Sequence, residues 1–146
     1  MKTLFQHHAN IDTPGITPLH IACASNRLEV VKELLKHKPD IDPIRTGRLT
    51  PLMIAAERGY FEILQELLKH GADINFRFAL YGNALHYAIE QGHVEIVETL
   101  LKNGCNTNVR AKKIDESEEL PNCTAFELSL YLESIDMVKM VAFHVN

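Results

Sequence analysis

The chain has 146 residues, of which 46% are hydrophobic and 23% charged, and its formal net charge is −4 at pH 7. These values are ordinary for one globular domain, and the negative charge gives no electrostatic argument for binding nucleic acid or an acidic membrane. The sequence has no run of 18 apolar residues, no secretory signal pattern and no C-x-x-C pair, so we expect reduced structural thiols and an intracellular place of action, in the cytoplasm or the nucleus.

Residues 1–16 read as the end of a structural repeat that recurs further on. Residues 4–12 (LFQHHANID) parallel residues 67–75 (LLKHGADIN) in the spacing of their leucine, histidine and aspartate or asparagine positions. We therefore expect a partial repeat that starts inside the second helix of a helix pair. Either the chain is cut from a longer protein, or a partner covers this end.

A six-residue motif at residues 17–22 (TPLHIA) begins the first complete repeat. Thr17 can cap a helix, Pro18 suits the first helical position, and Leu19 starts an apolar stripe. The motif returns as TPLMIA at residues 50–55 and NALHYA at 83–88, each 33 residues later, and more weakly as TAFELS at 124–129 after 41 residues.

Each motif is followed by a turn and then by a second apolar run with helical spacing. The turn residues are Asn26, Gly59, Gly92 and Glu133, and the runs begin at Leu28, Phe61, Val94 and Ile135. The pattern predicts repeats at residues 17–49, 50–82 and 83–123, followed by an incomplete C-terminal repeat at 124–146. The third of these carries an enlarged hairpin loop at residues 109–123.

The repeat resembles the ankyrin repeat, whose signature is T-P-L-H-x-A at a period of 33 residues. The resemblance covers nearly the whole chain. It implies a single ankyrin-repeat domain, residues 1–146, folded as an all-α solenoid of stacked helix-turn-helix repeats with short β-hairpin fingers. In the family the motif histidine bonds its own threonine and a neighbouring backbone. Met53 and Glu127 replace it in the second and fourth repeats, which predicts an interrupted network.

The resemblance also implies that the chain binds a protein partner through a concave face formed by the fingers and the first helices. Carrying that face over by position gives the candidate partner-binding residues Arg45, Arg48, Leu49, Arg58, Arg77, Phe78, Leu80, Tyr81, Gln91, Glu116 and Tyr131. The third finger, residues 76–81, combines aromatic side chains with arginine, which are the types that dominate interface hot spots. These side chains either bind the partner or pack against the enlarged loop. Tyr131 and Leu132 likewise either extend the site or lie under that loop.

Two features of the C-terminal half remain open between a structural and a binding role. The enlarged loop is either a solvated insertion or a binding element whose acidic residues meet a basic partner. In the last repeat, Met137, Met140, Val141 and Phe143 predict an apolar end, where a solenoid usually needs a polar one. Such an end could permit end-to-end association, although we expect a monomer.

The sequence predicts no enzyme, no cofactor and no metal. It contains no nucleophile or phosphate-binding motif, and His37 and His70 lie one repeat apart, which is too far for one zinc ion.

Three other hypotheses stay open beside the interaction module. The chain could be the targeting or substrate-recognition part of a larger effector, ligase adaptor or regulatory protein, acting in a host cell's cytoplasm if it is a secreted effector. It could be a stand-alone enzyme inhibitor. Asn75 and Asn108 also occupy positions that are hydroxylated in some ankyrin proteins.

Overall fold

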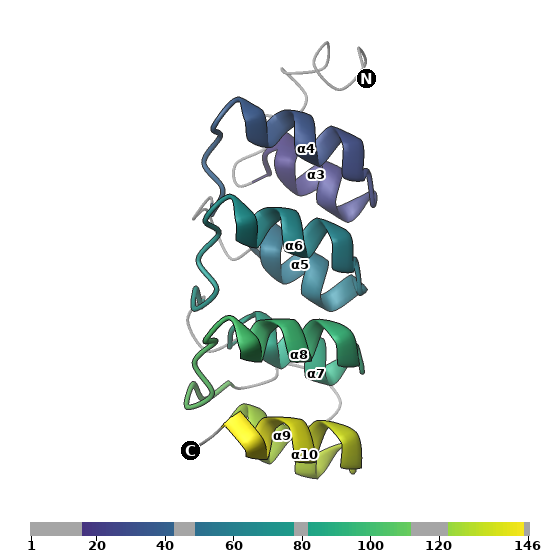
Figure 1. Cartoon of the computed structure of the whole chain (residues 1–146), viewed down its shortest axis with the longest axis vertical. Coiled ribbons are helices and arrows are strands. Elements are labelled where there is room, and N and C mark those ends of the chain that lie inside the picture. The colour runs from purple at the N-terminus through teal and green to yellow at the C-terminus, as the bar shows by residue number, and fades with distance from the viewer. Residues whose placement is uncertain (1–15, 43–48, 78–81, 112–122, 145–146) are drawn as a thin grey trace. The chain divides into compact units, whose positions relative to one another are not determined.

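The computed structural model describes residues 16–42, 49–77, 82–111 and 123–144 (Figure 1). Apart from one isolated bridge, the regular elements in these ranges are helices. They are α3 (Pro18–Ala24), α4 (Leu28–Lys36), α5 (Pro51–Arg58), α6 (Phe61–Lys69), α7 (Ala84–Glu90), α8 (Val94–Lys102), α9 (Ala125–Tyr131) and α10 (Ile135–His144). One helix pair falls within each predicted repeat from residue 17 onward.

The first helix of a pair is short and begins at a capping side chain. Thr17 caps α3, Asn83 caps α7 and Thr124 caps α9, each by accepting a hydrogen bond from the third residue of its helix. A cap of this kind satisfies a backbone donor that has no partner inside the helix. Pro18 occupies the first turn of α3, where its missing N–H costs nothing.

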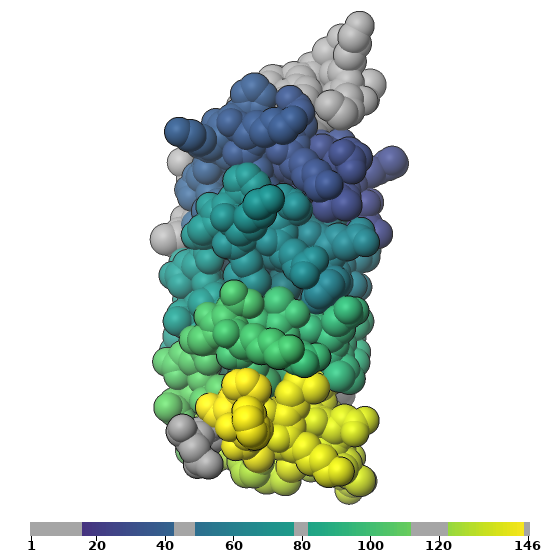
Figure 2. All heavy atoms as spheres, in the orientation of Figure 1, coloured from purple at the N-terminus to yellow at the C-terminus, as the bar shows by residue number. Residues whose placement is uncertain are grey.

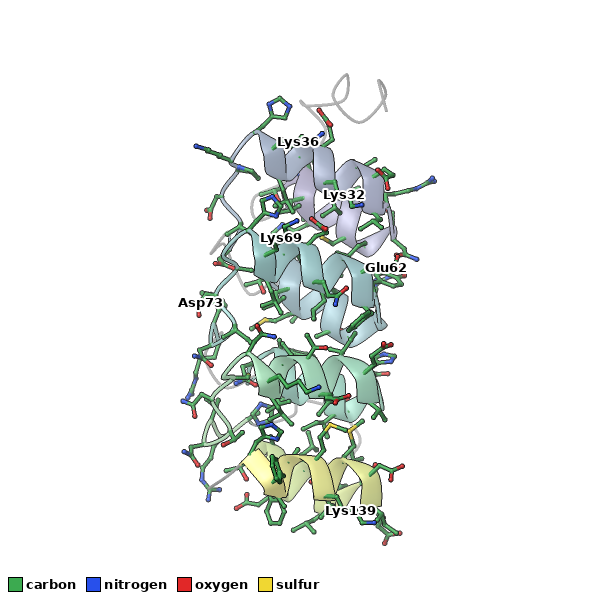
Figure 3. All side chains as sticks on the ribbon, viewed as in Figure 1. Lys32, Lys36, Glu62, Lys69, Asp73 and Lys139 are labelled. Carbon is green, nitrogen blue, oxygen red and sulfur yellow. The ribbon has the colours of Figure 1, made fainter. Side chains whose placement is uncertain are left out.

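The second helix of a pair is amphipathic. In α4, Val31, Leu34 and Leu35 are buried, and α6 and α8 bury the same kind of stripe. Charged side chains lie on the exposed side of these helices, as Figure 3 shows for Lys36, Glu62, Lys69 and Lys139. The apolar stripe therefore decides which side of each second helix faces the core.

The turn inside each helix pair requires a left-handed backbone at one residue. The φ angle is +78° at Gly59 and +74° at Gly92, and it is +54° at both Asn26 and Glu133. Glycine adopts this conformation freely and asparagine tolerates it. The left-handed backbone is therefore most strained at Glu133.

The chain divides into two compact units. The first comprises the residues up to Ala55 together with Tyr60–Asp73, and the second comprises Ala56–Gly59 together with Ile74–Asn146. In the first unit, α4 packs against α3 and α6. In the second, α7 packs against α8 and α9, and α10 packs against α8 and α9.

The core of each unit is built from the predicted apolar positions. In the first unit the fully buried large side chains include Leu19, Val31, Leu52, Met53, Ile63, Leu64 and Leu67. In the second they include Leu85, Ile89, Ile96, Leu100 and Met137.

One expectation about the last repeat is wrong in part. Met137 and Val141 do not contribute to an apolar outer end, because they are 1% and 0% exposed and face the core of the second unit. Of the four residues expected at this end, Phe143 is the one that is a highly exposed large hydrophobic residue, at 81%. The helical period of α10 places residues 137 and 141 on one stripe, which turns toward α8 and α9.

Candidate functional site

The histidine of the first motif ties the start of α3 to the residue before the second motif. The Nδ1 atom of His20 accepts from the Thr17 backbone N–H at 3.2 Å and lies 2.9 Å from the Thr17 hydroxyl. Its Nε2 atom donates to the Leu49 carbonyl at 2.8 Å. A neutral imidazole with its proton on Nε2 satisfies all three contacts. Leu49, a candidate binding residue, is thereby fixed through its backbone.

His86 plays the same part in the second unit. It is 4% exposed, and its Nε2 atom donates to the Cys123 carbonyl at 3.2 Å. The Asn83 amide nitrogen donates in turn to the Asn106 carbonyl at 3.0 Å. Burial lowers the pKa of His86, although hydrogen bonds to the carbonyls of Cys123 and Val109 partly oppose this. Burial thus favours the neutral form of a side chain that lies at the centre of a polar network.

The base of the enlarged loop is closed by backbone contacts that the sequence did not reveal. Ala111 and Cys123 form an antiparallel bridge, with their N–H groups donating to each other's carbonyls at 2.9 and 3.0 Å. Both residues are buried, as is Val109. Gly82 lies so close that a Cβ atom there would stand 2.6 Å from the Ala111 Cβ. The loop therefore leaves and rejoins the second unit at a fixed point, whichever of the two roles its tip has.

Glu127 caps its own helix in the last repeat, but it pairs with a side chain where the motif histidines bond a neighbouring backbone carbonyl. Its carboxylate accepts from the Thr124 backbone N–H at 3.1 Å, so the capping box is complete. The same carboxylate binds both terminal nitrogens of Arg110, each at 3.3 Å. A carboxylate can thus replace the imidazole when its partner is a guanidinium and not a carbonyl.

Met53 in the second motif behaves as a core side chain. It is 1% exposed, and its backbone N–H donates to the Thr50 hydroxyl at 3.2 Å. The thioether cannot donate a hydrogen bond onward as an imidazole does. The bond that His20 and His86 make to a neighbouring carbonyl therefore has no counterpart at Met53.

The segments that follow the second helices are joined by side chain to backbone hydrogen bonds. In the first unit, Asp42 accepts from the Asp73 N–H at 2.9 Å. In the second, the Asn75 amide oxygen accepts from the Asn106 N–H at 2.7 Å. Burial raises the pKa of the Asp42 carboxyl. Asn75, one of the two asparagines considered for hydroxylation, thus has a structural role on its amide oxygen.

His93 fixes the end of α5 within the second unit. Its Nε2 atom donates to the Glu57 carbonyl at 2.9 Å, and its ring lies against Gly59, where a Cβ atom would stand 2.6 Å from Cε1. Arg58, between these two contacts, is exposed. This candidate binding residue therefore projects from a rigidly held turn.

Besides Arg58, the structure describes three further candidate residues of the second unit. Arg77 follows Asn75, Gln91 follows the last residue of α7, and Tyr131 is the last residue of α9. All three are exposed, and the exposed fraction of Tyr131 is 53%. The remaining candidates Arg45, Arg48, Phe78, Leu80, Tyr81 and Glu116 lie outside the described residues.

The three cysteines are free and buried. Burial raises the pKa values of Cys23 and Cys105 to about 12, and it raises that of Cys123 as well. These side chains are therefore packed as neutral thiols, which is the predicted structural role.

The described ranges contain neither a metal-binding cluster nor a membrane span. No group of three or more His, Cys, Asp or Glu side chains there could hold a metal ion. Equally, none of the helices described is long and apolar enough to cross a bilayer.

Helix pairs that recur with one capping motif, one turn position and one buried stripe define a helical repeat protein. The family described as ankyrin repeats (3 copies) matches the chain at residues 1–78, 45–111 and 78–145. The chain belongs to the ankyrin-repeat family, and the predicted all-α repeat fold is confirmed. A comparison with curated proteins gave no match. Ankyrin repeats are generally protein–protein interaction modules and typically non-enzymatic.

Proposed function

We propose that the chain recognises a protein partner through the face formed by the ends of its first helices and by the fingers. The observation that carries this proposal is the row of exposed residues at Arg58, Gln91 and Tyr131, which end α5, α7 and α9 or follow them directly. Arg58 lies between the two His93 contacts, and the N–H groups of Gln91 and Leu132 close the ends of α7 and α9 by backbone hydrogen bonds. Little backbone conformational entropy is therefore lost when a partner binds.

The side chains of this face indicate the chemistry of the partner. Arg58 and Arg77 are exposed cations, and Tyr131 adds an exposed aromatic ring beside Leu132, which is 38% exposed. Arginine and tyrosine are enriched among interface hot spots. A protein surface that combines carboxylates with an apolar centre suits this set. By this proposal the chain acts by binding and not by catalysis.

The second helices provide the comparison surface. Their outer sides carry short-range ion pairs such as Lys102 with Glu98 at 2.8 Å and Lys36 with Glu33 at 3.3 Å. Such exposed pairs support the helix and contribute little to recognition. A control substitution on that side should therefore leave partner binding unchanged.

The experiment that tests the proposal is affinity capture followed by titration. The chain and a Phe78→Ala, Tyr81→Ala variant serve as baits in a cell extract, and recovered proteins are identified by mass spectrometry. A purified partner is then titrated against the parent chain, Arg77→Ala, Tyr131→Ala and the control Lys102→Ala.

We expect the double variant to lose the partner, and each of the two single variants to bind at least about fivefold more weakly. The Lys102→Ala control should bind as the parent does. A partner whose affinity changes in Lys102→Ala but in neither Arg77→Ala nor Tyr131→Ala would place recognition on the second helices and overturn the proposal.

A further inference from the structure

The exposed large hydrophobic residues of the described ranges gather in the last helix pair. Five of the six are Leu130, Tyr131, Leu132, Ile135 and Phe143, and the sixth is Val94 of α8. Ile135 is 69% exposed and Leu130 is 50% exposed. Figure 2 shows α10, coloured yellow, at the surface of the molecule. A cluster of this kind marks an interaction site more often than scattered apolar residues do.

The equivalent positions of the third repeat show which surface this is. Leu85, Ile89, Val97 and Leu101 are between 0% and 4% exposed, and their helices α7 and α8 pack against α9 and α10. The residues at the same repeat positions in α9 and α10 are Phe126, Leu130, Val138 and Ala142. None of these four is buried. We call these four residues the terminal face.

The earlier repeats bury the same positions. The first repeat has Leu19, Cys23, Val31 and Leu35 there, all between 0% and 3% exposed. The second has Leu52, Ala56 and Leu64, at 0% or 1%, and the less deeply buried Leu68. The terminal face is therefore apolar at positions that this fold uses for contact with another helix pair.

At two positions the terminal face departs from a residue that the other three repeats share. The first-helix position is leucine in the other repeats and Phe126 here, and the second-helix position is leucine in the other repeats and Ala142 here. Compared with the other repeats, the first helix therefore carries a larger side chain on this face and the second helix a smaller one. Phe126 and Leu130 form one stripe with a spacing of four residues, and Val138 and Ala142 form another.

We propose that the terminal face binds the terminal face of a second copy of this chain about a twofold axis. In this arrangement α9 of one copy lies on α10 of the other. The large stripe of Phe126 and Leu130 meets the small stripe of Val138 and Ala142, and the symmetry repeats the contact in reverse. The sequence alone favoured a monomer; the size exchange between the two helices is what favours a pair.

Pairing of two chains is a separate property from partner recognition, but it would strengthen the binding of a partner. A twofold pair presents two copies of the first-helix ends within one assembly. Two sites on one partner, or two partners close together, would then be bound with the gain that a high effective concentration gives.

Sedimentation equilibrium of the 146-residue chain over about 1–100 µM tests the proposal. We expect the parent to approach twice the mass of one chain as its concentration rises. Leu130→Glu, which places a charge on the exposed part of the terminal face, should be monomeric. Val94→Glu, at the matched exposed hydrophobic residue outside the face, should associate as the parent does.

The Ala142→Leu variant distinguishes association through complementary packing from non-specific hydrophobic association. It installs the residue that the other three repeats carry at this position, so it is compatible with the fold, but it fills the space proposed for Phe126 of the second copy. We expect it to weaken association at least about tenfold, with an unchanged melting temperature by circular dichroism. An adhesive apolar surface would associate as strongly or more strongly.

Three results would overturn the proposal. They are a parent chain that stays monomeric over the whole range, a parent that forms an open series of larger assemblies, and an Ala142→Leu or Leu130→Glu variant that pairs as strongly as the parent.

Discussion

The third and fourth repeats begin with the same capping geometry but use different chemistry at the motif position. In the third repeat, His86 is buried and reaches forward to the Cys123 carbonyl. In the fourth, Glu127 is exposed and reaches back to Arg110. The imidazole donates to the backbone before the next repeat, whereas the carboxylate accepts from a side chain that precedes its own repeat. The motif position thus connects a repeat to whichever neighbour can supply the complementary group.

The same two repeats differ at the turn and at the position of Leu101, which in the fourth repeat is Ala142 of the terminal face. Gly92 adopts its left-handed backbone without strain, while Glu133 adopts it as a residue with a Cβ atom. Leu101 is 4% exposed, and the alanine at its equivalent position is not buried. The third repeat therefore shows which residues stabilise the fold. The residues at which the fourth repeat differs from it are the ones that we expect to take part in binding.

Truncating the two motif side chains should give the largest difference. His86→Ala removes a buried side chain together with its hydrogen bonds to Asn83 and to the Cys123 carbonyl, although that carbonyl keeps the Ala111 N–H as a donor. We expect a loss of about 3 kcal/mol in the free energy of unfolding. Glu127→Ala removes an exposed cap and ion pair and should cost about 1 kcal/mol. Urea unfolding of both variants measures the two values, and equal losses would contradict the distinction between them.

A pair of glycine substitutions sharpens the same comparison at the turns. Gly59→Ala places a Cβ atom 2.6 Å from the His93 ring as well as in a left-handed backbone, and it should destabilise the chain by about 2 kcal/mol. Gly92→Ala has the same backbone strain, but no atom within 4 Å, and should cost about 1 kcal/mol. Thermal unfolding distinguishes them, and a larger loss in Gly92→Ala would show that the His93 contact is unimportant.

The pH dependence of stability should show the contribution of His86. Its pKa is lowered from 6.5 in the folded chain by burial, so the unfolded state binds more protons as the pH falls. The stabilisation is therefore complete above pH 6.5 and is lost progressively below it. His86→Gln should reduce the slope of unfolding free energy against pH in that acidic window. An unchanged slope would assign the acid sensitivity to other groups.

The smallest expected effect is a gain. Glu133→Gly relieves the left-handed strain at the fourth turn, and the greater entropy of the unfolded glycine offsets part of that gain. We expect a net stabilisation of about 0.5 kcal/mol. Asn26→Gly is the matched control, because asparagine already tolerates the same φ angle of +54°. A loss of stability in Glu133→Gly would mean that the Glu133 side chain makes a contribution of its own.

Local patterns were enough to predict the helix pairs and their caps. The T-P-L-H-x-A motifs place Thr17 and Asn83 at helix starts, and the leucine spacing assigns the buried stripes, because both signals lie within a few residues of the structure they cause. The turn at Gly59 and Gly92 follows for the same reason.

Contacts between distant residues could not be predicted from those patterns. The bridge between Ala111 and Cys123 and the pair of Arg110 with Glu127 both span the enlarged loop, whose length hides the register. The inward direction of Met137 was also missed, because α10 carries Ile135, Val138 and Phe143 beside the buried stripe of Met137 and Val141, so that hydrophobicity alone did not mark the buried side.

Hydrogen exchange of the chain with and without its captured partner tests the central claim most directly, because it reads out every helix in one experiment. We expect slower exchange on binding at residues 76–77, at the end of α7 with residues 91–93, and at the end of α9 with residues 132–134, and no change in α4, α6 and α8. Protection confined to α4, α6 and α8, with the first-helix ends unchanged, would contradict it.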